Sequence, residues 1–73
     1  MSKEHDLVVL RRDVPAHGLK AGDVGVVVGV YPEGGLEVEF VNAGGTTLAV
    51  LTLSKDELRP MAGSEILHVR AVA

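Results

Sequence analysis

The amino-acid sequence predicts an all-β protein built as a small five-stranded barrel. Valine dominates the apolar residues, and β-branched side chains favour strands. Short apolar runs alternate with glycine-containing turns, which is typical of consecutive antiparallel strands. The run over residues 24–31 contains glycines inside a strand, and such glycines mark the bends that a small barrel requires.

Length and composition indicate one folded domain. The chain has 73 residues, and its hydrophobic fraction of 47% is ordinary for a folded protein. It contains no cysteine, so no disulfide contributes to its stability. The polar residues 1–6 do not resemble a signal peptide, and no stretch approaches the length of a membrane span, so we expect a cytoplasmic location. We divide the chain into an N-terminal tail (1–6), a barrel (7–60), and a linker with an apolar C-terminal segment (61–73).

The first two strands are expected over residues 7–10 and 24–31, separated by a long loop. Pro15 favours an extended conformation at Val14, and Gly18 permits a turn in this loop. A two-residue period places four valines on one face of the second strand, and we predict that this face is buried: Val24, Val26, Val28 and Val30.

Two hairpins follow, with turns at residues 32–35 and 42–45. In the strand over residues 36–41, acidic and apolar side chains alternate, which predicts a solvated face and a buried face. The buried set predicted for this strand is Leu36, Val38 and Phe40. The strand over residues 46–53 is expected to bury Leu48 and Val50.

The end of the chain is expected to add a short turn and two strands. Ser54 is a favourable cap for a 3₁₀ turn over residues 54–57, and residues 58–60 form a brief fifth strand. Residues 65–73 are expected to form an additional strand, with a short helix starting after Ser64 as the alternative. In that strand a uniformly apolar face is expected to be buried, against the chain's own barrel or in a homodimer: Leu67, Val69 and Ala71.

The predicted order of strands, hairpins and a 3₁₀ turn before the last strand resembles an SH3-like barrel over residues 7–60. Residues 18–27 resemble the strand–turn–strand motif of KOW domains, which bind RNA or proteins. The pattern D-x-P-x-x-G-L-x-x-G-D-x-G-x-V-V over residues 13–28, followed by E-V-E-F over residues 37–40, is similar to a family of short uncharacterised bacterial proteins. That resemblance implies the fold and no established activity. The position of some relatives beside toxin-like proteins implies an antitoxin-like or accessory role.

No catalytic or metal-binding pattern is present in the sequence. The spacing of His5, His17 and His68 matches no ligand motif, and a metal site needs at least three converging ligands. Glu37 and Glu39 share one face of a strand, but a solvated surface explains them better than a hydrolytic pair. We therefore expect no enzyme activity, no catalytic residues and no cofactor.

The candidate binding residues are basic or aromatic, and we predict that they contact a partner: Arg11, Arg12, Lys20, Tyr31 and Arg59. The four basic residues are expected near one end of the barrel, although isolated solvated charges are the alternative. A net charge of −3 and a single exposed aromatic disfavour nucleic acid and proline-rich peptides. We expect a protein partner, with a KOW-like RNA- or ribosome-associated role as the alternative function.

Overall fold

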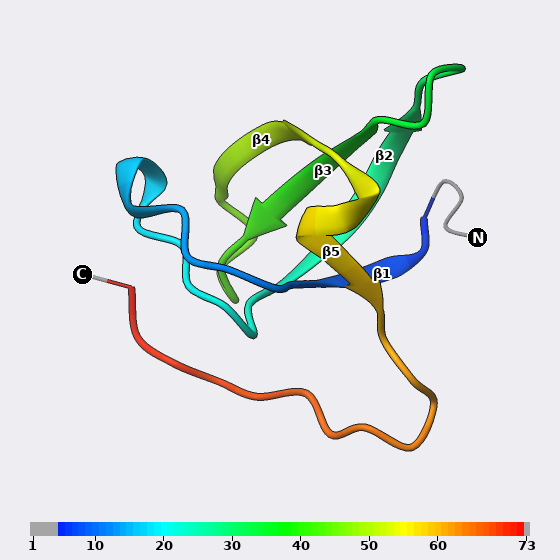
Figure 1. Cartoon of the computed structure of the whole chain (residues 1–73). Coiled ribbons are helices and arrows are strands. Elements are labelled where there is room, and N and C mark those ends of the chain that lie inside the picture. The colour runs from blue at the N-terminus through cyan, green and yellow to red at the C-terminus, as the bar shows by residue number, and fades with distance from the viewer. Residues whose placement is uncertain (1–4, 73) are drawn as a thin grey trace.

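The computed structural model describes residues 5–72 and arranges five strands in one antiparallel sheet (Figure 1). The sheet order is β4-β3-β2-β1-β5. The strands are β1 (Leu7–Leu10), β2 (Val24–Val30), β3 (Leu36–Val41), β4 (Thr47–Leu53) and β5 (Leu58–Pro60). Two 3₁₀ turns, η1 (Pro15–His17) and η2 (Lys55–Glu57), precede β2 and β5. The predicted all-β class and its five strands are confirmed.

Short turns connect β2, β3 and β4 into the predicted meander of antiparallel strands. In the first turn the Tyr31 N–H donates to the Gly35 carbonyl oxygen at 2.9 Å. Gly34 adopts a φ of 97° there, a conformation that side chains other than glycine rarely accept. In the second turn the Thr46 N–H donates to Asn42 Oδ1 at 2.9 Å. These local contacts fix the register that brings the strands together.

The core lies on the concave side of the curled sheet and draws on every strand. Its buried members are Val8, Leu10, Leu19, Val27, Leu36, Val38, Phe40, Leu53 and Leu58. The alternation predicted for β3 is confirmed, because its three apolar side chains are all buried. Leu19 comes from the loop between β1 and β2, where the Val14 N–H donates to the Leu19 carbonyl oxygen at 2.8 Å. That contact folds the loop over one end of the core.

The prediction of which face of β2 is buried is wrong. Gly25 and Val27 point inward, whereas Val24 and Val26 are half-buried and Val28 and Val30 are exposed. Phe40 and Val38 fill the space where a side chain at position 25 would stand, so the glycine must face them. Both faces of this strand are apolar, so close packing with β3 decides which face is buried.

The predicted bend in β2 is present. The register with β3 shifts between Val27 and Gly29, so a bulge lies beside Gly29 as expected for a glycine inside a barrel strand. A bulge increases the local twist of a strand, which helps the sheet to curl around its core.

The inward face of β4 also differs from the prediction. Ala49 lies opposite Phe40 and Leu51 lies opposite Val38, and directly paired residues share one face of a sheet. Ala49 and Leu51 therefore pack against the core, while Val50 is exposed. Leu48, the other residue expected inside, is half-buried at a second register shift. β4 is uncharged, so its sequence contains no polar face that would have indicated this orientation.

The C-terminal segment forms neither the expected strand nor the alternative helix in its described part, residues 61–72. It leaves β5 beside β1, where the Met61 N–H donates to the Leu7 carbonyl oxygen at 3.3 Å. It then sweeps away and returns toward the loop that precedes β2 (Figure 1). Leu67 and Val69, which were expected to be buried, are 58% and 88% exposed, and Ala71 is exposed as well. Of the expected N-terminal tail, only His5 and Asp6 are described.

Candidate protein-binding surface

Arg12 lies just beyond β1 and pairs with Glu57 of η2. The Arg12 guanidinium donates to the Glu57 carboxylate. The other carboxylate oxygen of Glu57 accepts from the Ser54 N–H at 2.9 Å and from the Ser54 hydroxyl at 3.3 Å. The Ser54 N–H and then the Arg12 guanidinium hold the pKa of Glu57 below its usual range. Arg12 is thus engaged by its own chain, where it secures the turn before β5.

Arg59 of β5 is also paired within the chain. Its two terminal nitrogens donate to the two carboxylate oxygens of Glu65, each at 2.8 Å. Glu65 Oε1 also accepts from the Ala62 N–H at 2.6 Å. The Arg59 guanidinium, together with that N–H, lowers the pKa of Glu65 to about 2. This clamp holds the first turn of the C-terminal segment against β5.

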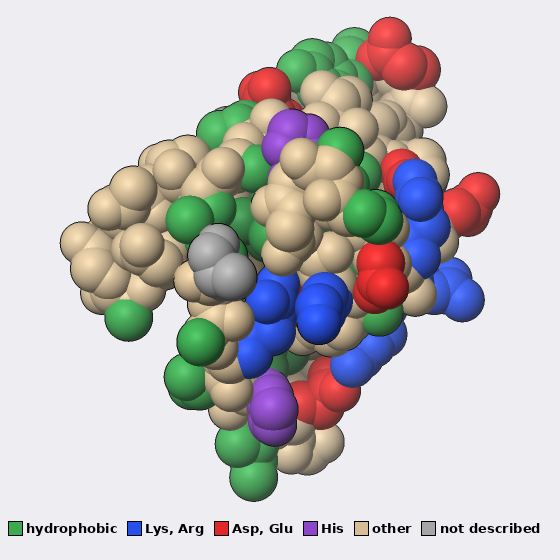
Figure 2. All heavy atoms as spheres, turned by 90° about the vertical axis from the view of Figure 1, so that its left-hand side faces the viewer, with side chains coloured by type: hydrophobic (Ala, Val, Ile, Leu, Met, Phe, Trp, Pro, Cys, Tyr) green, Lys and Arg blue, Asp and Glu red, His purple; other side chains and the backbone are tan. Residues whose placement is uncertain are grey.

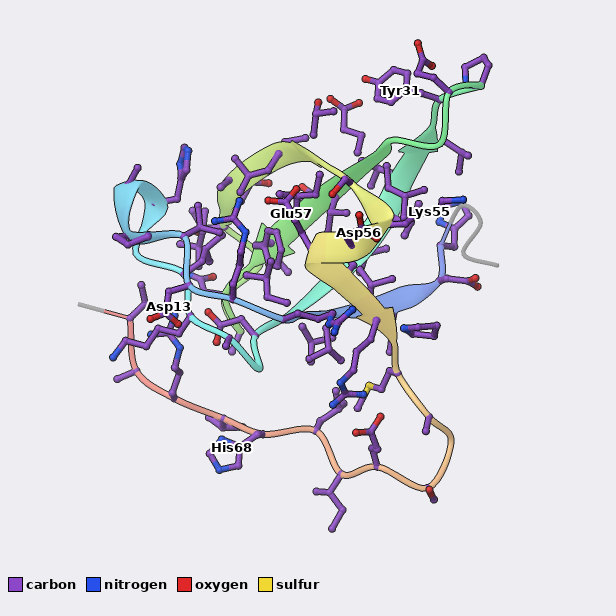
Figure 3. All side chains as sticks on the ribbon, in the orientation of Figure 1. Asp13, Tyr31, Lys55, Asp56, Glu57 and His68 are labelled. Atoms are coloured by element: carbon purple, nitrogen blue, oxygen red, sulfur yellow. The ribbon has the colours of Figure 1, made fainter. Side chains whose placement is uncertain are left out.

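The other predicted binding residues lie on separate elements. Arg11 follows β1, where its N–H donates to the Glu57 carbonyl oxygen at 2.9 Å. Lys20 is exposed on the loop before β2. Tyr31 is exposed at the β2–β3 turn, at the end of the molecule opposite His68 (Figure 3). Basic and acidic side chains are intermixed on one side of the face shown in Figure 2. The five candidates therefore lie in four parts of the fold: just after β1, on the loop before β2, at the β2–β3 turn and on β5.

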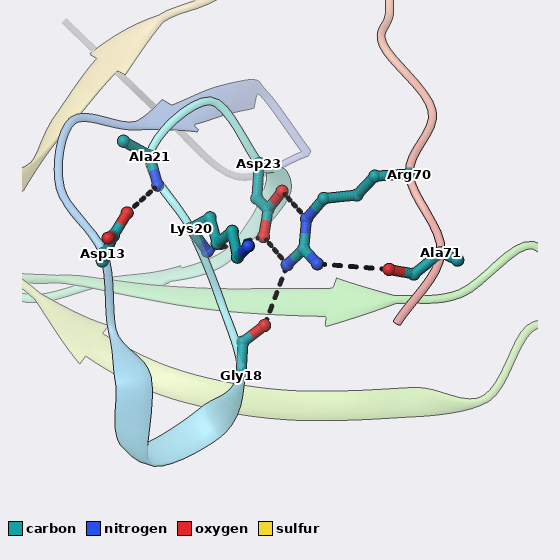
Figure 4. A network of polar contacts seen from close by, with 7 residues as sticks. All are labelled: Asp13, Gly18, Lys20, Ala21, Asp23, Arg70 and Ala71. Carbon is teal, nitrogen blue, oxygen red and sulfur yellow. Dashed lines mark hydrogen bonds and ion pairs between the residues drawn. The ribbon is translucent and has the colours of Figure 1, made fainter. Parts of the chain in front are cut away.

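A polar network at Asp23, absent from the sequence-based prediction, joins the C-terminal segment to the loop before β2 (Figure 4). Arg70 Nε donates to Asp23 Oδ1 at 2.7 Å, and Arg70 Nη2 donates to Asp23 Oδ2 at 2.5 Å. The same Nη2 donates to the Gly18 carbonyl oxygen at 2.8 Å. The Arg70 guanidinium holds the pKa of Asp23 below its usual range. The only available sequence signal was a single arginine near the end of an apolar segment.

The free edge of β4 is the feature best suited to binding a partner. Among residues 5–72, β4 pairs with β3 alone, so its second edge has no neighbouring strand. Residues 46–53 contain neither a charged residue nor proline, the two devices that commonly protect an edge. Val50 points away from the core and is 48% exposed. An unpaired, uncharged edge of this length can accept an extended chain through backbone hydrogen bonds.

The outward face beside this edge combines acidic and apolar groups. Val50 lies in register with Glu39, and Thr52 lies in register with Glu37. The Thr47 hydroxyl donates to Glu39 Oε2 at 2.6 Å, which holds this carboxylate over the sheet. A segment bound at β4 would meet valine and threonine side chains first and two carboxylates on the next strand.

Within the described part of the chain, no group of three histidine, aspartate or glutamate side chains is placed to hold a metal ion. Among residues 5–72, no helix has the length and hydropathy of a membrane span.

Comparisons with known proteins place the chain in a family but beside no characterised protein. No curated protein matches the sequence, and no solved structure matches the fold. The resemblances to SH3-like barrels and KOW domains therefore stay predictions. One family model, described as a domain of unknown function (DUF4926), matches residues 4–60. Because this match spans most of the 73 residues, the chain belongs to the DUF4926 family of domains of unknown function.

Proposed function

We propose that this protein is a non-catalytic, cytoplasmic protein-binding module with an accessory or antitoxin-like role, and that β4 accepts an extended segment of its partner. The observation that carries this proposal is the edge of β4 that no strand of residues 5–72 pairs with and that has no charge along residues 46–53. The strand order and the 3₁₀ turn before β5 support the resemblance to SH3-like barrels.

The chemistry of the edge favours a protein ligand. Strand addition satisfies the backbone groups of both chains, and side chains at alternate positions of the ligand then contact the flanking faces. On the outward face, Val50 and Thr52 supply a mixed surface without a charge that would repel the ligand. On the inward side, Ala49 and Leu51 remain only partly buried, so apolar side chains of a bound segment would gain further burial there.

Internal ion pairs weaken the case for the alternative, a KOW-like RNA-binding role. Arg12, Arg59 and Arg70 each form an ion pair with a carboxylate of their own chain, which reduces their availability to phosphates. Base stacking would depend on Tyr31, the single tyrosine of the chain. Arg11 and Lys20 would have to provide most of the phosphate contacts.

The proposal is tested by capturing partners with tagged full-length chains expressed in the native host. Val50→Lys places a charge on the free edge, whereas Val30→Lys places the same charge at a similarly exposed valine of β2 (50% against 48%). We expect wild type and Val30→Lys to capture the same partner and Val50→Lys to lose it. Retention of the partner by Val50→Lys would refute binding at this edge.

A second measurement distinguishes the RNA-binding alternative. The purified chain is mixed with total RNA at low salt and its electrophoretic mobility is followed. We expect no complex. A tight complex that dissociates as salt is added would favour the KOW-like role instead.

A further inference from the structure

We propose that a second copy of this chain occupies the β4 edge when no other partner is bound, and that it does so with residues 65–72 of its C-terminal segment. This inference rests on the proposed function, in which the β4 edge accepts an extended segment. The C-terminal segment is the part of the described chain with the most exposed apolar side chains. Ile66 is 91% exposed and Val69 is 88% exposed. Large side chains this exposed gain substantially from any surface that covers them.

The alternation of the segment matches the two faces of β4. In an extended conformation the side of residues 66–72 that carries no polar group would continue the inner face of the sheet beside Ala49 and Leu51, which are only partly buried. That face comprises Leu67, Val69 and Ala71. Glu65, which shares this side at the start of the segment, is bound to Arg59. The remaining seven residues, 66–72, equal the seven residues of β4, so the pairing can run along the whole edge.

The opposite face of the segment is complementary in charge to the sheet. His68 and Arg70 would lie on the outward side, together with Ile66 and Val72. β4 carries no charge there, and the next strand carries Glu37 and Glu39 on that side. Two strand spacings amount to about 10 Å, which the long arginine side chain can bridge toward a carboxylate. One orientation therefore satisfies both faces of the segment.

The chain's own segment is held away from its own β4 edge. It emerges from the end of β5, where the Met61 N–H donates to the Leu7 carbonyl oxygen of β1. Arg70 then fastens it to Asp23 and Gly18, on the loop between β1 and β2. A neighbouring copy supplies the same segment without this constraint. Two chains related by a two-fold axis can exchange segments reciprocally, so that each edge is covered and the assembly closes as a dimer.

Trans-complementation tests the exchange with full-length chains. Val50→Lys blocks the edge and leaves the segment intact, whereas Val69→Asp blocks the segment and leaves the edge intact. We expect the wild type to dimerise in sedimentation equilibrium and each variant to be monomeric. An equimolar mixture should recover dimer, because the intact segment of the Val50→Lys chain can then pair with the intact edge of the Val69→Asp chain.

Each outcome of this experiment is decisive. A monomeric wild type, a dimeric single variant or a monomeric mixture would overturn the inference. If the segment docks on its own barrel, the wild type will be monomeric. Both substitutions are at half-exposed or exposed positions, and circular dichroism verifies that each variant folds. If Val50→Lys fails to fold, Thr52→Lys blocks the same outward side from an exposed position. Loss of partner capture by Val50→Lys together with a monomeric wild type would overturn this inference and leave the proposed function standing.

A further variant weakens the competing contact without touching either docking surface. Asp23→Asn removes the charge that holds Arg70, while the amide oxygen can still accept from the Lys20 N–H, which is 2.8 Å from the carboxylate in the native chain. Releasing the segment should favour the exchanged dimer, because docking on the neighbouring β4 edge and the Arg70–Asp23 contact compete for the same segment. We expect the dimer dissociation constant to fall about twofold to fivefold. An unchanged or higher constant would show that the Arg70 contact does not oppose dimerisation.

Discussion

Gly25 of β2 and Phe40 of β3 pack so closely that a Cβ atom at position 25 would stand 2.8 Å from Phe40 Cε2 and 2.5 Å from Val38 Cγ1. Both contacts are shorter than real carbon atoms tolerate, so the absence of a side chain at position 25 is a condition of the packing. Gly25→Ala should therefore destabilise the protein by about 1–3 kcal/mol, because the core must shift to admit one methyl group. Urea unfolding monitored by circular dichroism measures this change.

Gly29 of the same strand provides the matched control. The nearest atom to a Cβ at that position is Glu37 Cβ, at 3.4 Å, which is an ordinary contact. Gly29→Ala should change the free energy of unfolding by no more than about 0.5 kcal/mol, because the added methyl group meets only ordinary contacts. Equal destabilisation by the two alanines would show that contact with Phe40 and Val38 does not set the cost of a side chain at position 25.

The orientation of β2 can be tested with two adjacent valines. Val27 is fully buried, whereas Val28 is exposed at the bulge. Val27→Ala should cost about 1.5–3 kcal/mol of folding free energy, the value of burying one such side chain. Val28→Ala should be nearly neutral. A larger effect at Val28 would support the opposite face, which the sequence pattern had favoured.

Leu19 tests whether the loop before β2 belongs to the core. Its side chain is 3% exposed although it lies outside every strand. Leu19→Ala should destabilise the protein by about 2–5 kcal/mol, which is a large part of the roughly 4–11 kcal/mol expected for a chain of this length. His17→Ala, an exposed position in the same loop, should have little effect. Similar melting temperatures for the two variants would contradict a packed loop.

The contact between Arg59 and Glu65 predicts a distinct pH dependence. The pKa of Glu65 is lowered to about 2 in the folded chain, against an ordinary value of 4.5. A carboxyl whose folded pKa is depressed contributes stability above its unfolded pKa and loses that contribution as the pH falls from about 4.5 to about 2. Titration of the Glu65 side chain by NMR should therefore give a midpoint near 2.

Arg59→Gln supplies the control for this titration. The strongest cause of the lowered pKa is the hydrogen-bonded guanidinium of Arg59, so its removal should raise the Glu65 midpoint toward 4.5. The Ala62 N–H would still donate to the carboxylate, so the return should be incomplete. A midpoint that does not move in this variant would mean that Arg59 is not bound to Glu65 in solution.

The strands of this protein could be predicted from sequence because their signals are local. Glycine- and proline-containing turns separate the β-branched runs, and the structure places each strand within about one residue of its predicted bounds. The face of β3 was also predictable, since Glu37 and Glu39 alternate with buried apolar residues. Wherever a strand has one charged face, the charges alone identify the side that must stay in water.

The remaining features depend on contacts between distant parts of the chain. β2 and β4 have no charged face, so a period of two cannot reveal which side of either strand is buried. The packing of Gly25 against Phe40 decides the orientation of β2, and the register with β3 decides that of β4. Arg70 and Asp23 are 47 positions apart, and nothing near either residue indicates the other. The unpaired edge of β4 follows from the strand order of the whole sheet. A sequence read locally therefore predicts the elements of this fold better than the surface they create.

Residues 61–72 are held near their start by the Met61 N–H on Leu7 and by the Arg59–Glu65 ion pair, and near their end by the Arg70 guanidinium on Asp23. The arginine therefore meets its carboxylate at an effective concentration that the connecting chain sets, on the order of millimolar for a short flexible tether. Free guanidinium ions must reach a comparable concentration before they displace it. Cleavage of the chain between residues 65 and 70 would remove this advantage, and a contact that is now intramolecular would have to form by diffusion between separate molecules.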